Sequence, residues 1–194
     1  MGFRIAILIS GRGSNMHNII KACIDKKLNS SVNLVISNQS NALGLKIADK
    51  YDTDTYVLDS DSQSTKKFEE QLNKVLKKKN INLICLAGFM KILSNDFIKK
   101  WPNQILNIHP SLLPAFKGLN PQKQALENRA KFSGCTVHYV NEKIDGGTII
   151  DQKVVNISID DDVISLSKKI LMEEHKLYIK VLKKLEKNYG KVKQ

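Results

Sequence analysis

The sequence has few cysteines, and their spacing excludes two common ways of holding a small protein together. Its 194 residues contain three cysteines, Cys23, Cys85 and Cys135, which are far apart and form no CxxC pair. An odd number without that spacing argues against a disulfide framework and against a zinc ribbon. Cys85 and Cys135 lie within apolar runs of strand character, so we expect them to be buried structural thiols.

Long hydrophobic runs are also missing. No stretch approaches the roughly 18 to 20 apolar residues that are needed to cross a bilayer. The apolar segment from Phe3 to Ile9 is too short for the hydrophobic part of a signal peptide, and it runs directly into a glycine-containing loop. The sequence therefore predicts a cytoplasmic protein that has no membrane partner.

Arginine is scarce in a chain that is otherwise strongly basic. Lys and Arg number 31 against 19 acidic residues, a net charge of +12, yet only Arg4, Arg12 and Arg129 are arginines. Recognition of guanine and of phosphate favours the arginine fork, whereas these lysines follow the outer faces of expected helices. We expect solvated surface charge and no nucleic-acid partner. A basic, non-enzymatic nucleic-acid-binding module stays open as an alternative, which a steep salt dependence of binding would favour.

Several catalytic signatures are absent. There is no HExxH, no GxSxG nucleophile elbow and no GK[ST] phosphate loop, and no two of the four histidines stand at zinc-ligand spacing. No cysteine lies in an evident activating loop. The sequence predicts no metal site and no acyl-enzyme intermediate. Taken individually, His17, His138 and His175 give little reason to expect a site.

What the sequence does contain is an alternation of apolar strand-like runs and amphipathic helices. Several runs are apolar on both faces, which is typical of parallel strands covered on each side. The pattern predicts an α/β fold with a doubly wound, mostly parallel sheet and helices on both faces. The expected strands are 3–9, 32–36, 55–58, 83–87 and 105–108, and the expected helices are 16–25, 42–51, one starting at Ser64 and one from Ser94 to Lys100.

The C-terminal third has a different pattern. Two strands, 135–140 and 148–155, are separated by NEKIDGG, in which Gly146 and Gly147 allow a tight turn. This arrangement predicts an antiparallel strand region after the parallel sheet. A long helix is expected over 163–187 behind an acidic start, with residues 190–194 frayed. No linker or repeat divides the chain, so we expect a single domain.

A glycine-containing loop, Gly11-Arg12-Gly13-Ser14-Asn15, joins the first expected strand to the first expected helix. Glycines allow close approach of the backbone, and the start of the helix offers unpaired N–H groups to an anion. Met16 stands where a dinucleotide fingerprint has Gly or Ala, and no acidic residue ends the second strand. The loop therefore favours a single phosphate monoester, with an ordinary strand-to-helix turn as the alternative.

Asn107 and His109 are two apart at the end of an expected strand, so their side chains project from the same face. In an open α/β sheet, ligands bind at that carboxyl end. An amide beside an imidazole can donate to a carbonyl oxygen and move a proton. Asp145, on the turn before Gly146, could reach the imidazole and stabilise its charged form. From the residues alone, a turn aspartate satisfied by backbone amides is an equal alternative.

Taken together, these segments resemble the phosphoribosylglycinamide formyltransferases over most of the chain. The matching pieces, in the family's order and spacing, are LISGRGSNMHNII, ISNQSNALGLKIA, LAGFMKILS, LNIHPSLLPAFKGLNPQKQALEN, TVHYVNEKIDGGTIIDQ and EEH. HPSLLP also resembles other enzymes that use 10-formyltetrahydrofolate, whereas GRGSN points to the glycinamide ribonucleotide enzymes. The resemblance implies the formyltransferase fold in one domain, 1–194, with a nucleotide-binding half, 1–109, and a catalytic and folate-binding half with the C-terminal helix, 110–194.

The resemblance also implies a function. A formyl group would pass from 10-formyltetrahydrofolate, as co-substrate, to the amine of glycinamide ribonucleotide in de novo purine synthesis, by direct attack and without a metal. The catalytic residues would be Asn107, His109 and Asp145. The enzyme would be a monomer or a homodimer. The ribonucleotide would bind Gly13, Ser14, Asn15 and Glu174, and the folate would bind Lys66, Met90, Lys91, Ile92, Leu93, Asn107, Asn141, Glu142, Lys143 and Ile144.

Two segments depart from the family pattern, and both concern contacts to the folate tail. Asn120-Pro121-Gln122 stands where the family often has a histidine-containing sequence, and near Thr65 only Lys66 and Lys67 replace a common arginine. Two related enzymes remain as alternatives. A formyltetrahydrofolate hydrolase would use the same three residues on water, and a methionyl-tRNA formyltransferase would act on RNA. Each is expected to carry a further domain, and we expect neither, because the chain starts at the first strand and ends after the long helix.

Overall fold

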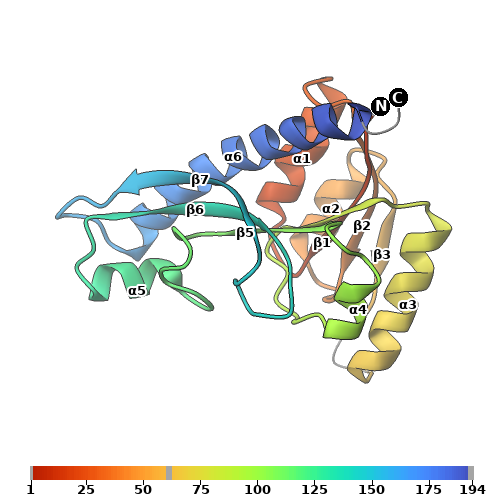
Figure 1. Ribbon diagram of the computed structural model, residues 1–194, viewed down its shortest axis with the longest axis horizontal. Coiled ribbons are helices and arrows are strands. Elements are labelled where there is room, and N and C mark those ends of the chain that lie inside the picture. The colour runs from red at the N-terminus through yellow and green to blue at the C-terminus, as the bar shows by residue number, and fades with distance from the viewer. Residues whose placement is uncertain (1, 60–62, 192–194) are drawn as a thin grey trace.

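The structure, a computed structural model, describes residues 2–59 and 63–191 and contains a seven-stranded sheet (Figure 1). The strand order is β3-β2-β1-β4-β5-β6-β7. Strands β1 to β5 are parallel, whereas β6 runs antiparallel to β5 and β7 antiparallel to β6. The predicted doubly wound sheet with an antiparallel C-terminal region is confirmed. The strands are Arg4–Ile9 (β1), Ser31–Ser37 (β2), Thr55–Val57 (β3), Leu83–Leu86 (β4), Ile105–His109 (β5), Phe132–Tyr139 (β6) and Ile149–Asn156 (β7).

Alternation along the strands divides the apolar side chains between two cores. In β1, Ile5 and Ile7 belong to one core, while Ala6 and Leu8 belong to the other. The first core packs against α1, α2, α5 and α6, and the second against α3 and α4, so helices cover both faces of the sheet, as predicted (Figure 1). The helices are Ser14–Ile24 (α1), Leu43–Asp49 (α2), Thr65–Lys78 (α3), Asn95–Lys99 (α4), Pro121–Glu127 (α5) and Val163–Lys191 (α6).

Two helices that pack on the second core, α3 and α4, begin at the serines where the sequence predicts a helix to start, Ser64 and Ser94. The Ser64 side chain accepts a hydrogen bond from the Lys67 amide at the start of α3, and the Ser94 side chain accepts one from the Phe97 amide at the start of α4. Both satisfy a backbone donor that the first helical turn leaves free. The buried Glu69 carboxylate on α3 also accepts hydrogen bonds from the amide and hydroxyl of Ser94, which fixes α4 against α3.

The sequence pattern does not predict α5. This helix has only seven residues. Asn120, which precedes it, has a left-handed backbone with φ 54°, and Pro121 is its first residue. Apart from Pro121, its apolar residues are only Ala125 and Leu126, which are adjacent, so no apolar spacing of helical period is visible in the sequence. Its buried Ala125 packs into the core that α6 also covers, so tertiary contacts, not local pattern, stabilise it.

The predicted turn between β6 and β7 is present. Gly146 and Gly147 are needed there because neighbouring atoms leave no room for a Cβ, and not because their backbone is left-handed. The residue with positive φ is Asp145, at 48°. A Cβ on Gly147 would lie 1.7 Å from the carbonyl oxygen of Tyr139, and one on Gly146 would lie 2.7 Å from the Cβ of Lys143. Larger residues at these positions would push the turn away from β6, and Asp145 would move with it.

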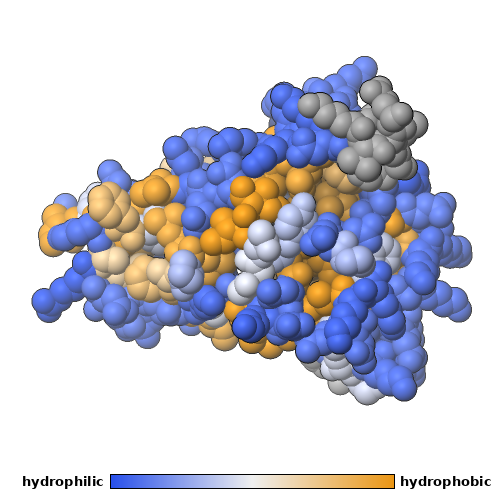
Figure 2. Space-filling view, in the orientation of Figure 1, coloured by the Kyte–Doolittle hydropathy of each residue, from blue (hydrophilic) through white to orange (hydrophobic). Residues whose placement is uncertain are grey.

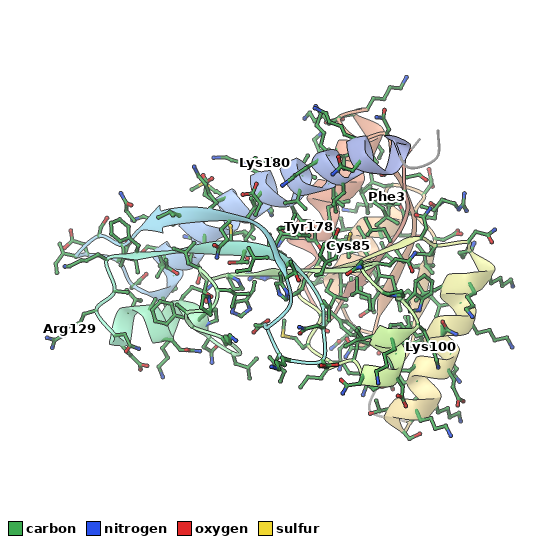
Figure 3. All side chains as sticks on the ribbon, viewed as in Figure 1. Phe3, Cys85, Lys100, Arg129, Tyr178 and Lys180 are labelled. Atoms are coloured by element: carbon green, nitrogen blue, oxygen red, sulfur yellow. The ribbon has the colours of Figure 1, made fainter. Side chains whose placement is uncertain are left out.

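Helix α6 is the longest element and crosses the face of the sheet that carries the first core (Figure 1). It runs to Lys191, beyond the predicted 187, so residues 190 and 191 are helical rather than frayed, and 192–194 lie outside the described residues. Tyr178 projects from α6 toward the sheet near Cys85 (Figure 3). The buried hydroxyl of Tyr178 donates to the carbonyls of Leu86 and Leu106, which anchors α6 on β4 and β5.

The polar surface and the buried cysteines fit what the composition of the sequence leads us to expect. Hydrophobic surface runs across the middle of the face shown in Figure 2, whereas hydrophilic residues cover α3 and the upper edge along α6. Within 2–59 and 63–191, no helix is long and apolar enough to cross a membrane. Cys85 and Cys135 are free and fully buried, as predicted, and burial raises the pKa of each thiol to about 12.

Candidate active site

A large cleft opens at the carboxyl ends of β1, β4 and β5. Strands β2 and β3 are added on one side of β1, and β4 and β5 are added on its other side, so the strand order reverses between β1 and β4. Open α/β sheets bind ligands at such a point. The cleft has a volume of about 1160 Å³. Its walls come from the loop after β1, the segment 86–93 after β4, the end of β5, the segment 118–122, the turn 140–145 and the N-terminal half of α6.

The structure brings Asn107, His109 and Asp145 together at one end of this cleft. Asn107 and His109 lie on the same face of β5, as the spacing predicts, because the core residues Leu106 and Ile108 face the other side. His109 Nδ1 lies 3.4 Å from Asp145 Oδ2, and both side chains are about nine-tenths buried. An ion pair sheltered from water in this way is screened less than a surface pair. Asp145 therefore reaches His109 from the turn, and it also accepts a hydrogen bond from a backbone amide, that of Gly118.

The other nitrogen of His109 is also occupied by an acceptor. His109 Nε2 lies 2.9 Å from the carbonyl oxygen of Phe116, and the Gly118 amide donates to Asp145 Oδ2 over 2.9 Å. The loop that makes both contacts has left-handed backbone at Phe116, Gly118 and Asn120. Both ring nitrogens of His109 therefore face oxygen atoms that accept hydrogen bonds, so an N–H on either nitrogen has a partner.

A second histidine, His138, joins this group from β6. Antiparallel pairing sets it opposite Asn107, and its Nε2 lies 3.2 Å from Asn107 Nδ2 and 3.9 Å from Asp145 Oδ1. The sequence alone gave no reason to single out His138. Its position depends on the register between β5 and β6, which no local motif reveals.

The opposite end of the cleft is formed by the glycine loop and α6. Gly13 has φ 72° and precedes α1 without a side-chain cap, so the first amides of the helix stay available. A Cβ on Gly13 would lie 2.8 Å from the Cα of Gly44, so the loop packs directly on the start of α2. Asn15 Nδ2 donates to Glu174 Oε2 over 2.9 Å, which joins α1 to α6.

Polar atoms at this end lack protein partners. Asn15 Oδ1 is buried, and no described residue donates to it. Burial raises the pKa of Glu174 from 4.5 to about 7, and the hydrogen bond from Asn15 only partly offsets this. Arg12 and Lys168 also line the cleft, and within 2–59 and 63–191 neither has an ion pair or a hydrogen bond to its side chain. Sequence reasoning named Arg12 only as part of the loop and missed Lys168.

Most of the expected folate-contacting residues lie along one wall of the cleft. Met90, Ile92 and Ile144 are exposed to it, whereas Leu93 lines it but is mostly buried in the second core. Lys91 lines the cleft with its ammonium group 5.2 Å from the centre of the Phe68 ring. The turn residues Asn141, Glu142 and Lys143 line the cleft as well.

Lys66 is the expected site residue that the structure does not bring to the cleft. It is exposed in the first turn of α3 and is not among the residues that line the cleft. Separately, no three His, Cys, Asp or Glu side chains are grouped to hold a metal ion in the part of the chain that the structure describes.

Comparison with known proteins identifies the family of this chain. The family model described as formyl transferase matches residues 3–182. A phosphoribosylglycinamide formyltransferase of Haemophilus influenzae is 37% identical over 181 residues, which cover 93% of this chain and 85% of that protein. The chain belongs to the phosphoribosylglycinamide formyltransferase family.

Solved structures of the family agree with the fold. The crystal structure of glycinamide ribonucleotide transformylase 1 from Symbiobacterium toebii is 39% identical, has a TM-score of 0.94, and is matched over 96% of this chain and 89% of that one. A trifunctional purine biosynthetic protein of Gallus gallus is 42% identical over 176 residues, 90% of this chain. The chain spans only 18% of the length of that larger protein.

Proposed function

We propose that this protein transfers the formyl group of 10-formyltetrahydrofolate to the amine of glycinamide ribonucleotide, a step of de novo purine synthesis. The observation that carries the proposal is the placement of the buried His109–Asp145 pair, with Asn107 beside it, in the same cleft as an open helix start. A formyl acceptor with a phosphate at its far end would span these two features. Membership of the family supports the same reaction.

The ribonucleotide would lie at the glycine-loop end. Its phosphate would accept from the free amides at Gly13, Ser14 and Asn15, where the helix dipole also favours an anion. Arg12 is the nearest cation along the chain and has no protein partner among the described residues. The ribose hydroxyls would donate to Glu174 and to the unpartnered Asn15 Oδ1.

The folate would lie along the opposite wall. The exposed apolar side chains of Met90, Ile92 and Ile144 offer a surface for a flat pterin ring, and Leu93 lies behind them. Asn141, Glu142 and Lys143 would supply polar contacts from the turn before Asp145, and Lys91 would supply a cation. Lys66 stays a predicted contact for an extended tail only, since it lies outside the cleft.

The chemistry follows from the groups at the end of the cleft where Asn107, His109 and Asp145 lie, which we call the catalytic end. The neutral amine attacks the formyl carbon, and the negative charge that develops on the formyl oxygen is stabilised by N–H donors. Asn107 supplies one donor. His109 Nε2 supplies another once the substrate displaces the Phe116 carbonyl that occupies it in this structure. Asp145 stabilises the charged imidazole, and holding both substrates in one cleft supplies much of the rate.

Protons must balance in this reaction. The attacking amine loses one proton, and the leaving N10 atom of the folate gains one. His109 is placed to give its proton to N10, directly or through a water held by Asp145, and to regain one from the amine. Neither a metal nor a covalent enzyme intermediate is needed. The same proposal includes a cytoplasmic enzyme, monomeric or homodimeric, that binds neither nucleic acid nor membranes.

One assay tests the reaction. The purified protein is incubated with 10-formyltetrahydrofolate, with and without glycinamide ribonucleotide, and release of tetrahydrofolate is followed together with formation of the formylated ribonucleotide. We expect release only when the ribonucleotide is present, in a one-to-one ratio with product. Equal release in its absence would instead identify a formyltetrahydrofolate hydrolase. An Asn107→Ala variant serves as the control for contaminating activity.

A further inference from the structure

The contacts of His138 determine which of its two nitrogens carries hydrogen. The His138 side chain is 3% exposed, and its Nδ1 lies 2.9 Å from the carbonyl oxygen of Tyr139. A carbonyl oxygen accepts hydrogen bonds and cannot donate, so Nδ1 must be the protonated nitrogen. The hydrogen on Nδ1 is therefore fixed by the backbone of β6.

The surroundings also keep the ring neutral. Burial lowers the pKa of His138 below its ordinary value, and the charge on His109 acts in the same direction. The Tyr139 carbonyl and Asp145 oppose this effect without outweighing it. Because a neutral imidazole has one N–H, Nε2 is left with a lone pair and acts as an acceptor.

An acceptor at Nε2 decides the orientation of the Asn107 amide. Asn107 Nδ2 lies 3.2 Å from Nε2 and can donate to it, whereas a flipped amide would place its oxygen against the lone pair. The amide nitrogen has a second hydrogen, for which none of residues 2–59 and 63–191 provides an acceptor. Asn107 lines the cleft, so this second hydrogen is available to a ligand there.

We infer that His138 is a positioning residue: its unprotonated Nε2 holds the Asn107 amide so that one N–H of that amide points at the reacting formyl oxygen. The inference rests on the proposed function for the identity of the ligand. The orientation itself rests on the contacts of His138 and on the burial that keeps its ring neutral. Without His138, the Asn107 amide would be free to rotate and would present its oxygen to the developing negative charge in part of the molecules.

The kinetic test uses two variants that differ in one property. His138→Leu removes the acceptor, and we expect kcat to fall about 100-fold with the KM of both substrates nearly unchanged. In His138→Gln the side-chain oxygen can accept from Asn107, so at least tenfold of that loss should return, in line with a restored donor. Circular dichroism and thermal unfolding verify that both variants fold.

A double-mutant cycle separates positioning from a general structural effect. In an Asn107→Ala background, His138→Leu should change kcat less than about twofold, because the group through which His138 acts is already gone. A His138→Leu loss as large in that background as in the wild type would overturn the inference, as would a failure of His138→Gln to recover activity.

Nitrogen NMR of the wild-type protein, labelled at histidine, gives a readout that needs no substrate. We expect the resonances of His138 to show a protonated Nδ1 and an unprotonated Nε2 at neutral pH. A protonated Nε2 would overturn the inference even if formyl transfer is confirmed. If the wild type shows this tautomer but transfers no formyl group, the proposed function fails instead.

Discussion

The two ends of the cleft differ in how completely the protein satisfies its own polar groups. At the catalytic end, His109 and Asp145 contact each other and the loop 116–118, and Asn107 contacts His138. At the glycine-loop end, Asn15 Oδ1 is buried without a donor among the described residues, and the side chain of Arg12 has no partner among them either.

This difference separates two tasks. Catalytic donors that are held before the substrate arrives need no reorganisation as charge develops. A binding end with unmet hydrogen-bonding capacity carries a desolvation cost in the free protein, which a ligand with complementary groups removes. The catalytic end should therefore control kcat, and the glycine-loop end should control the affinity for the ribonucleotide.

The largest effect is expected for Asn107→Ala at the catalytic end. Loss of one donor to the formyl oxygen should raise the barrier by about 2.7 to 4 kcal/mol, which lowers kcat about 10²- to 10³-fold. Steady-state kinetics with both substrates measures this, and the KM of the ribonucleotide should change little. Near-normal turnover would show that the catalytic end does not work as described.

Glu174→Gln tests the cost that the binding end carries in the free protein. Because burial raises the pKa of Glu174 from 4.5 to about 7, the folded state binds more protons than the unfolded state between these values. The contribution of Glu174 to stability is therefore full below pH 4.5 and declines as pH rises to about 7. Above pH 7 the variant should gain on the order of 3 kcal/mol over the wild type.

Chemical unfolding of both proteins from pH 5 to pH 8 checks this expectation. The difference in unfolding free energy between variant and wild type should grow in favour of the variant across that range. Two curves that stay parallel would mean that Glu174 is not held in a costly buried site. The variant should nevertheless bind the ribonucleotide more weakly, since it loses an ionised acceptor for the ribose hydroxyls.

Arg12→Gln tests the charge at the binding end. We expect the KM of the ribonucleotide to rise about tenfold, about 1.4 kcal/mol, with kcat unchanged. Arg129→Gln is the matched control, because Arg129 is exposed at the far end of the molecule and lies outside the cleft (Figure 3). An equal effect of both substitutions would point to overall charge and not to a local contact.

The smallest effect on activity is expected from Ser94, which follows the cleft residues 86–93 and begins α4. Ser94→Ala removes the cap of α4 and the hydrogen bond from the Ser94 hydroxyl to Glu69, so the free energy of unfolding should fall by about 1 kcal/mol. The folate KM should rise with it, because residues 86–93 of the cleft wall lead into this cap. Ser64→Ala removes the cap of α3 and should affect stability alone.

The sequence predicts most of the sheet because local pattern and tertiary position agree there. Strand β1 is apolar on both faces, and its Ile5, Ile7, Ala6 and Leu8 fill two different cores, so its lack of polar alternation already indicates burial on both sides. Helix α5 is the counterexample. Its few residues are held by packing of Ala125, which a local pattern cannot reveal.

The same contrast applies to the site. The spacing of Asn107 and His109 places both on one face of β5, which the sequence predicts correctly. Their partners, Asp145 and His138, arrive by a turn and by strand pairing. The residues alone therefore left Asp145 with an equal alternative, the resemblance favoured its catalytic role, and nothing indicated His138. Asn15 and Glu174 are 159 residues apart and meet only because α6 packs on α1.

Steady-state kinetics of Ser14→Tyr beside Asn107→Ala, with glycinamide ribonucleotide as the varied substrate, tests the division of the cleft most directly. We predict that Ser14→Tyr raises the KM about tenfold or more while kcat is retained, since the bulky ring covers the free amides of α1. Asn107→Ala should lower kcat and leave the KM in place. A change of the same parameter in the same proportion in both variants would contradict a division of the cleft into a catalytic end and a binding end.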